Sequence, residues 1–267
     1  MKLARLATSH GPEWASFRDG GYYQVTWVDG RPQETGKALS ERRLLAPVEP
    51  PVILAIGRNY REHAAETGAS IGEYPVLFVK TPNALSNPGD DIVLPRKLRS
   101  DKVDYEGELA FVISKQAKNV SKTDAMDYVV GFTIANDVSA RDWQKEWGGS
   151  QWIKGKSFDS FCPIGPYVVT LDEFENWSRL RLTTRVNGEV VQEGNTDDLI
   201  FDIPTLIEFL SGSTTLYPGT VVLTGTPHGV GMARTPPRWL EPGDTVEVEI
   251  EGIGTLVNHV VEEGSRK

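Results

Sequence analysis

Two glutamates in the middle of the chain have a spacing that can bind a metal ion. Glu106 and Glu108 belong to the stretch 104–113, whose second half is rich in β-branched and aromatic residues and therefore predicts a strand. Side chains alternate along a strand, so both carboxylates point to the same face and repel each other unless a cation lies between them. Carboxylate oxygens suit a hard ion such as Mg²⁺, with Mn²⁺ or Ca²⁺ as alternatives. The competing interpretation is two solvated glutamates on the wet face of an edge strand.

A third acidic residue follows a second predicted strand. The apolar run 129–136 is followed directly by Asp137, and burying an acid at the end of such a strand is costly unless it is paired or binds a metal. Asp137 is therefore a candidate third ligand beside Glu106 and Glu108. Its competing role is that of the N-cap of the next helix.

A histidine and a glutamate have the spacing of a catalytic pair. His63 and Glu66 are three residues apart in a predicted short helix at 61–67, which Gly68 ends, so they share one face. An imidazole oriented by a carboxylate can act as a general base. The alternative is an exposed pair that interacts weakly. The glycines at 68 and 72 also predict a mobile segment that would suit a lid.

Three carboxylates around one divalent ion leave a net negative charge, so an anionic substrate needs nearby cations. Lys156, Lys80 and Arg58 are the candidates for that role. A 2-oxo acid can chelate the ion through its carboxylate and keto oxygens, which polarises the ketone and stabilises an enolate. Hydrolysis of a C–C bond, decarboxylation and keto–enol or double-bond isomerisation all share this step. They differ in whether water activated by His63 or only a proton reacts next.

The composition limits the class of protein. The 267 residues are 39% hydrophobic and 24% charged, as expected for a globular protein with a large core. The net charge of −9 argues against nucleic acid or an anionic membrane as a partner. The single cysteine, Cys162, excludes an intramolecular disulfide and is expected to be a buried structural thiol. The N-terminal apolar run is too short for a signal peptide and no run can cross a bilayer, so we expect a cytoplasmic protein.

The elements that must position these residues fall into two parts. Residues 1–50 are expected to form a small N-terminal β-rich module, with a strand at 22–28 and a hairpin turn at Asp29–Gly30. Prolines at positions 47, 50 and 51 mark the boundary to a catalytic domain at residues 51–267. Two further elements are predicted there, a hairpin with the turn Asn187–Gly188 and a helix at 202–210 with an acidic cap.

Five short motifs bring the candidate residues together: 57–60 with His63 and Glu66, 104–108, 136–142, 155–159 and 223–227. They stand in the order seen in the fumarylacetoacetate hydrolase family, which the chain resembles from roughly residue 50 to residue 262. The motifs are specific as a set, although each alone is weak. The stretches 151–166 and 227–241 are most similar to the branch called fumarylacetoacetate hydrolase domain-containing protein 2.

The resemblance implies a fold and a set of roles. The fold is mixed α/β but predominantly β, a mixed β-sandwich roll, and the proteins are usually homodimers with a divalent metal. By resemblance, Glu106, Glu108 and Asp137 hold the metal, and Lys156 contacts the substrate or its enolate. The pair corresponding to His63 and Glu66 activates water in the hydrolases. The residues that line the substrate site by resemblance are Arg58, Gln144, Gly225 and Thr226.

These observations predict an enzyme. The leading hypothesis is a metal-dependent hydrolase or lyase that breaks a C–C bond in a small anionic 2-oxo or 2,4-dioxo acid, such as an acylpyruvate. The alternatives are an oxaloacetate keto–enol tautomerase or decarboxylase, and an isomerase of the 2-hydroxyhepta-2,4-diene-1,7-dioate type. A further alternative is a non-catalytic family member that has kept the metal, although His63, Glu66 and Lys156 are all present.

Overall fold

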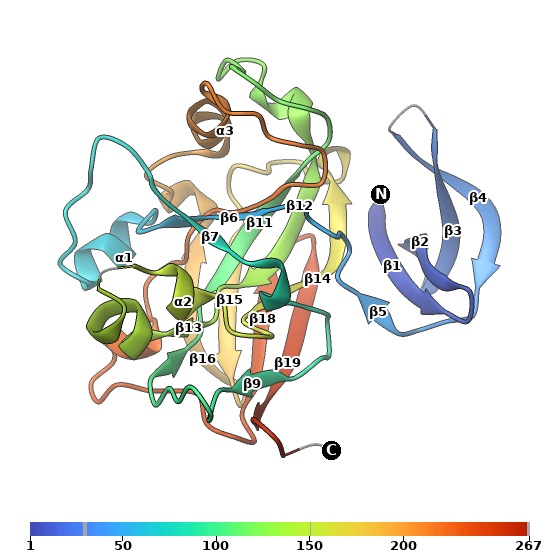
Figure 1. Cartoon of the computed structure of the whole chain (residues 1–267). Coiled ribbons are helices and arrows are strands. Elements are labelled where there is room, and N and C mark those ends of the chain that lie inside the picture. Colours follow the sequence, from blue (N-terminus) through green and yellow to red (C-terminus); the bar gives the residue numbers. More distant parts are fainter. Residues whose placement is uncertain (29–30, 150, 266–267) are drawn as a thin grey trace.

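The computed structural model of the chain describes residues 1–28, 31–149 and 151–265, and it is built mainly from two β-sheets (Figure 1). The larger sheet runs through ten strands, and two short strands attach to it. In spatial order the ten are β4 (Arg31–Leu39), β3 (Gly21–Val28), β2 (Gly11–Arg18), β1 (Lys2–Thr8), β14 (Cys162–Thr170), β12 (Val129–Asn136), β11 (Gly107–Ile113), β17 (Val221–Leu223), β6 (Ile53–Gly57) and β7 (Val76–Lys80). The attached strands are β5 (Leu44–Leu45), which pairs with β1, and β8 (Leu85–Ser86), which pairs with β14.

The smaller sheet has five strands and packs on the larger one. Strands β11, β12 and β14 contact it, and buried residues of both sheets, such as Phe111 and Leu182, belong to one continuous core. Its strands, in order, are β16 (Glu189–Asn195), β15 (Arg181–Val186), β18 (Thr245–Ile250), β19 (Gly254–Glu262) and β9 (Ile92–Leu94). A separate short ladder joins β10 (Val103–Asp104) to β13 (Ser139–Ala140).

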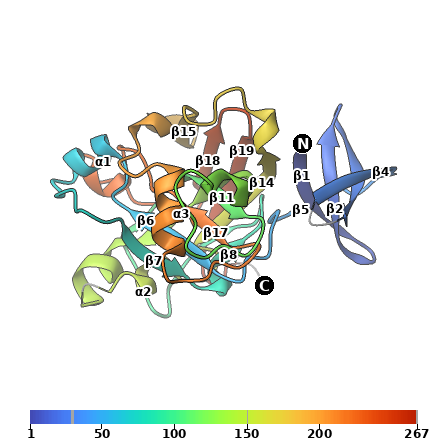
Figure 2. The same cartoon turned by 90° about the horizontal axis from the view of Figure 1, so that it is seen from above.

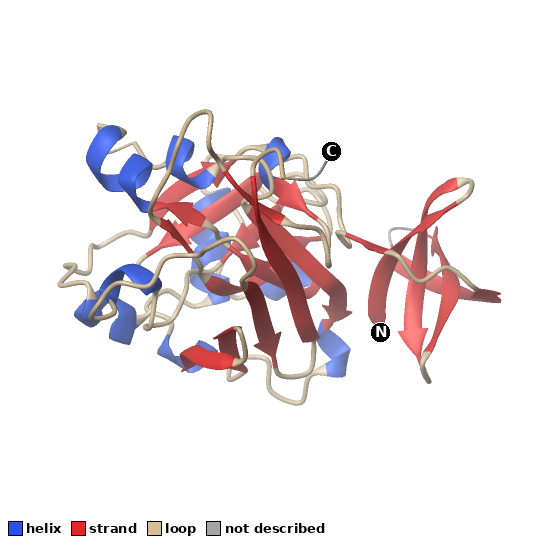
Figure 3. Ribbon diagram, turned by 90° about the horizontal axis from the view of Figure 1, so that it is seen from below, coloured by secondary structure: helices blue, strands red, loops and turns tan. Residues whose placement is uncertain are grey.

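The helices are short and lie around the strands (Figure 3). None of the helices in the described part of the chain has the length and apolar character that a membrane span requires. The helices are α1 (Arg61–Glu66), α2 (Ile153–Lys156) and α3 (Ile203–Ser211), with a π-helical segment at Asp142–Trp147. Single 3₁₀ turns occur at Pro82–Ala84, Ala125–Tyr128, Leu171–Glu173, Thr196–Asp198 and Gly231–Ala233.

Two elements of the larger domain agree with their prediction. The helix predicted at 202–210 is α3, whose N-cap Asp202 accepts a hydrogen bond from the backbone N–H of Thr205 at 2.9 Å. The hairpin turn predicted at Asn187–Gly188 joins β15 to β16, with φ angles of 54° and 81°. Positive φ at both central residues is the requirement of a type I′ turn.

The first strands form a body of their own beside the sandwich (Figures 1 and 2). The expected strand at 22–28 is part of β3, whereas the expected turn at Asp29–Gly30 lies outside the described residues. The body is joined to the rest of the larger sheet because β1 pairs antiparallel with β14, with Leu3 opposite Val168. It has a small core cluster of its own, Ala4, Leu6, Ala15, Tyr22 and Leu39.

The strand predicted at 104–113 is interrupted at the place that matters for the site. Strand β11 starts only at Gly107, and before it the backbone N–H of Glu106 donates to the side-chain Oδ1 of Asn136 at 3.0 Å. A glycine is required between the two glutamates because a Cβ at position 107 would lie 2.2 Å from Thr184 Oγ1 of the facing sheet. The close approach of the sheets therefore fixes the backbone that carries the two glutamates.

Candidate active site

The three predicted metal ligands meet in space. Glu106 precedes β11, Glu108 lies in it, and Asp137 follows β12, its antiparallel neighbour. Gly107 pairs with Asn136, which places the three carboxylates together, and one oxygen from each lies within 4.8 Å of the others. Three hard oxygen donors at this separation can bind a divalent cation.

Both alternative interpretations of these acids are wrong. Asp137 is not an N-cap, because its carboxylate accepts hydrogen bonds from Lys80 Nζ at 2.5 Å and from Lys156 Nζ at 2.6 Å. Glu106 and Glu108 are not solvated, because only 6% and 1% of their surface is exposed. All three carboxylates are therefore held inside the protein, where each needs a partner.

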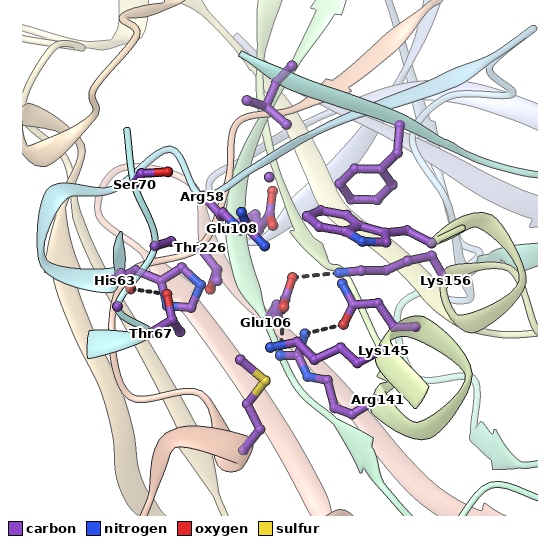
Figure 4. Close-up of a pocket in the computed structure, with 18 residues that line it drawn as sticks. Arg58, His63, Thr67, Ser70, Glu106, Glu108, Arg141, Lys145, Lys156 and Thr226 are labelled. Atoms are coloured by element: carbon purple, nitrogen blue, oxygen red, sulfur yellow. Dashed lines mark hydrogen bonds and ion pairs between the residues drawn. The ribbon is translucent and has the colours of Figure 1, made fainter. Parts of the chain in front are cut away.

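Cationic side chains reach two of the three carboxylates. Lys156 Nζ lies 2.8 Å from Glu106 Oε2, and Arg141 Nη2 lies 2.6 Å from Glu106 Oε1 (Figure 4). Asp137 binds the two lysines described above. Glu108 differs, since no cationic group of the described residues lies within ion-pair distance of it, and it accepts a hydrogen bond from the backbone N–H of Gly225 at 2.7 Å. Glu108 is thus a buried acid without a counter-charge.

The charges of this buried cluster fit an additional cation. Burial, and then the charges of Asp137 and Glu106, raise the pKa of Glu108 well above its ordinary value. Although burial opposes the shift, the charges of Lys156 and Arg141 hold the pKa of Glu106 below its ordinary range. A divalent ion beside Glu108 would remove the excess negative charge. The cluster has four carboxylates, Asp104, Glu106, Glu108 and Asp137, against three cations, Lys80, Arg141 and Lys156.

The histidine–glutamate pair lies in helix α1, and its imidazole faces the same cavity as the acids (Figure 4). His63 Nδ1 lies 3.2 Å from Glu66 Oε2, and Glu66 Oε1 accepts a hydrogen bond from the backbone N–H of Gly229 at 2.9 Å. Although burial opposes the shift, these two hydrogen bonds lower the pKa of Glu66. His63 is only 6% exposed, so the alternative of an exposed pair is wrong. The second bond of Glu66 fixes the orientation of the imidazole.

Glu106, Glu108 and the imidazole line one cavity of about 300 Å³, which is the size of a site for a small ligand. The structure brings most of the predicted residues to its wall. Arg58, Gln144 and Thr226 line the cavity together with His63 and Lys156. Asp137 lies beneath the wall, where its side chain is fully buried.

Two residues predicted to contact the substrate face the metal ligands instead. Lys80 does not line the cavity, because the pleat of β7 turns its side chain to Asp137 and to the backbone oxygen of Val138, which is 3.2 Å from its Nζ. The backbone N–H of Gly225 is taken by Glu108 and is not free for a ligand. Gly225 has a φ of 101°, and a Cβ there would lie 2.9 Å from Asn59 Cβ. Both residues therefore stabilise the carboxylates by hydrogen bonds and do not contact a ligand in the cavity.

The sequence reasoning missed two buried residues of the site. Asp104 accepts hydrogen bonds from Arg141 Nε at 2.9 Å, from the Gly231 N–H at 2.8 Å and from the Met232 N–H at 3.1 Å. Arg141 in turn binds Glu106, so Asp104 connects a candidate metal ligand to the 3₁₀ turn Gly231–Ala233, whose Met232 lines the cavity. The signal for Asp104 was present, since it continues the two-residue spacing of the glutamates. No comparable spacing identifies Arg141.

The site agrees with a known family. The family profile described as "Fumarylacetoacetate (FAA) hydrolase C-terminal" matches residues 52–261. The chain belongs to the fumarylacetoacetate hydrolase family. The family and the fold class predicted from the sequence, mixed α/β and predominantly β, are confirmed.

Relatives in this family carry the name of a tautomerase or of the family itself. The human protein "Oxaloacetate tautomerase FAHD2A, mitochondrial" is 48% identical over 223 residues, which are 83% of this chain and 70% of the relative. The "Fumarylacetoacetate hydrolase domain-containing protein 2 homolog" of Dictyostelium discoideum is 47% identical over 227 residues, which cover 82% of this chain and 74% of that protein.

Solved structures in the family match nearly the whole chain. The structure titled 2-hydroxyhepta-2,4-diene-1,7-dioate isomerase from Mycobacterium marinum is 38% identical with a TM-score of 0.86, covering 99% of this chain and 100% of that one. A fumarylacetoacetate hydrolase from Exiguobacterium antarcticum is 37% identical with a TM-score of 0.88, covering 98% and 99%. This fold therefore occurs with both an isomerase and a hydrolase title.

Proposed function

We propose that the protein is an isomerase that interconverts the keto and enol forms of a 2-oxo acid, with oxaloacetate as the candidate substrate and Mg²⁺ as the candidate metal. The observation that carries the proposal is one cavity lined by two acids of the triad, Glu106 and Glu108, and by an oriented imidazole. The names of the relatives support tautomerisation more than the C–C bond cleavage that we expected first. Both reactions form an enolate of the 2-oxo acid: tautomerisation forms it by removing a proton from C3, and hydrolysis forms it when water adds to the C4 carbonyl and the C3–C4 bond then breaks.

The chain's own residues supply the groups that tautomerisation needs. A divalent ion held by Glu106, Glu108 and Asp137 would supply Lewis acidity toward a carbonyl oxygen. His63 Nδ1 is engaged by Glu66, which leaves Nε2 to take the proton from the carbon next to the carbonyl in the keto-to-enol direction and to deliver it to that carbon in the reverse direction. The enol oxygen gains or loses its own proton by exchange with water. Lys156, which lines the cavity, carries an ammonium group that can donate to an oxygen on which negative charge develops. The reaction then needs no attacking water.

A fresh solution of enol-oxaloacetate tests the proposal directly. The ultraviolet absorbance of the enol is followed with Mg²⁺ present, with and without the protein, while a coupled assay measures pyruvate. We expect the protein to accelerate the loss of the enol without forming pyruvate. Pyruvate formed at the same rate would instead show a decarboxylase, and an unchanged rate of enol loss would refute the proposal.

A second candidate is hydrolysis of a 2,4-dioxo acid such as an acylpyruvate. It is favoured by the His63–Glu66 pair, which could equally activate a water molecule in this cavity. The same preparation, incubated with acetylpyruvate, distinguishes the two candidates. Release of acetate and pyruvate faster than the loss of enol-oxaloacetate would favour the hydrolase.

A further inference from the structure

Two cations at the cavity wall have no acidic partner. Arg58 and Lys145 both line the cavity (Figure 4), and neither forms an ion pair with any residue that the structure describes. In contrast, Lys156 at the inner end of the cavity binds two carboxylates. The acid next to Lys145, Glu146, is already bound to Lys102 at 2.5 Å. The positive charge at this wall is therefore available to a ligand.

Arg58 has an uncommon backbone conformation. Its φ of 57° is in the left-handed region, which residues other than glycine rarely adopt. The next residue, Asn59, is fully buried and anchors this turn by donating to the backbone oxygens of Phe201 at 3.0 Å and Thr224 at 2.8 Å. The guanidinium lies 5.5 Å from the ring centroid of Trp152. Residues in rarely populated backbone conformations, kept there by the surrounding structure, cluster at functional sites.

Lys145 lines the same cavity and comes from the π-helical segment Asp142–Trp147. Gln144, the residue before it, accepts a hydrogen bond from Arg141 Nη1 at 3.0 Å. Burial, and then the charges of Arg141 and Arg58, lower the pKa of Lys145. The charges of Glu106 and Asp104 oppose this shift and are outweighed.

We propose that Arg58 and Lys145 form a subsite for a second carboxylate, which makes the enzyme selective for 2-oxo acids with a carboxylate at both ends. The inference rests on the proposed function, in which the first carboxylate and the keto oxygen face the acid triad. A dicarboxylate then places its other end between the two unpaired cations. A monocarboxylate leaves both cations without a partner, so Lys145 is a specificity-determining residue.

The test compares the binding of malate and lactate, neither of which undergoes keto–enol exchange. Malate carries a carboxylate on the carbon that is the methyl group of lactate. Dissociation constants are measured by calorimetry on the Mg²⁺-loaded protein as wild type, Lys145→Met and Lys145→Arg. We expect Lys145→Met to weaken malate binding about tenfold, as for a partly exposed charge-assisted hydrogen bond. Lactate binding should not change, and Lys145→Arg should restore most of the malate affinity.

A matched control is Lys154→Met, which removes an exposed lysine that does not line this cavity and should leave both affinities unchanged. Equal binding of malate and lactate by the wild type would overturn the inference. An equal loss of both ligands in Lys145→Met would overturn it too. If the wild type fails to accelerate the loss of enol-oxaloacetate, yet Lys145→Met alone abolishes the preference for malate, the proposed function fails and the subsite stands.

Discussion

Replacing Glu108 by glutamine tests the charge balance of the acid triad. In the metal-free protein, burial and the neighbouring acids raise the pKa of Glu108 above its ordinary value of 4.5. A group whose pKa is raised by folding stabilises the folded state at low pH, and this stabilisation is lost as the pH rises through the folded-state pKa. Metal-free wild type should therefore lose stability as the pH rises above 4.5. The glutamine of Glu108→Gln cannot ionise, so this variant should lose less stability over the same pH range.

The magnitude follows from the number of uncompensated charges. The buried cluster has one more carboxylate than cations, so the folded state is expected to hold one more proton than the unfolded state. One proton corresponds to a slope of about 1.4 kcal/mol per pH unit in the free energy of unfolding. For each pH unit over which the folded state keeps this proton, the metal-free wild type should lose about 1.4 kcal/mol that the variant keeps. Mg²⁺ takes the place of the proton in the wild type and should restore its stability.

The assay is urea unfolding at several pH values, with a chelator and again with Mg²⁺ in excess. At a Mg²⁺ concentration about 100 times its dissociation constant, the wild type should gain about 2.7 kcal/mol, and Glu108→Gln should gain much less. Glu175→Gln is the control, because it removes an exposed acid outside the cavity and should behave as the wild type does. The reasoning is refuted if Glu108→Gln gains as much stability from Mg²⁺ as the wild type.

Other variants test the remaining roles. His63→Gln removes the proposed base and should slow the loss of enol-oxaloacetate by about 10²–10⁴-fold, with the Mg²⁺-induced stabilisation unchanged; a normal rate would contradict the role. Lys156→Met should reduce turnover by about 10²–10³-fold yet still bind Mg²⁺ by calorimetry, and loss of Mg²⁺ binding would assign this lysine to the metal site instead. Asp104→Asn breaks a buried ion pair with Arg141 and should lower the free energy of unfolding by about 3–5 kcal/mol; a loss under about 1 kcal/mol in urea unfolding would show that the pair does not hold the site together.

The parts of the site that depend on local spacing could be predicted from the sequence. The alternation of side chains predicts that Glu106 and Glu108 point to one side, and both reach the site although Glu106 lies just before β11. His63 and Glu66 share a helix face because they are three residues apart. Local spacing alone does not predict the position of Asp137. Its position beside the glutamates depends on the register of β11 against β12, which the pattern of apolar residues alone does not determine.

The parts that depend on contacts between distant elements could not be predicted. Lys80 and Gly225 were predicted to contact the substrate, but in the structure they bind Asp137 and Glu108. The packing of distant elements decides which partner a buried group has, and the sequence pattern does not show it. Arg141 was missed for the same reason, since its partner Asp104 lies 37 positions away in the sequence. The reaction itself was also open, because hydrolysis and tautomerisation use the same acids and the same imidazole.

The central claim is that Glu106, Glu108 and Asp137 hold one divalent ion at the end of the cavity that receives the substrate. Crystals grown with Mn²⁺ in place of Mg²⁺ and measured near the manganese absorption edge test it most directly. We predict a single strong anomalous peak bonded to oxygens of all three side chains, and no peak there in Glu108→Gln. A manganese peak elsewhere in the wild type, with the three carboxylates bound only to Lys80, Arg141 and Lys156, would contradict the claim.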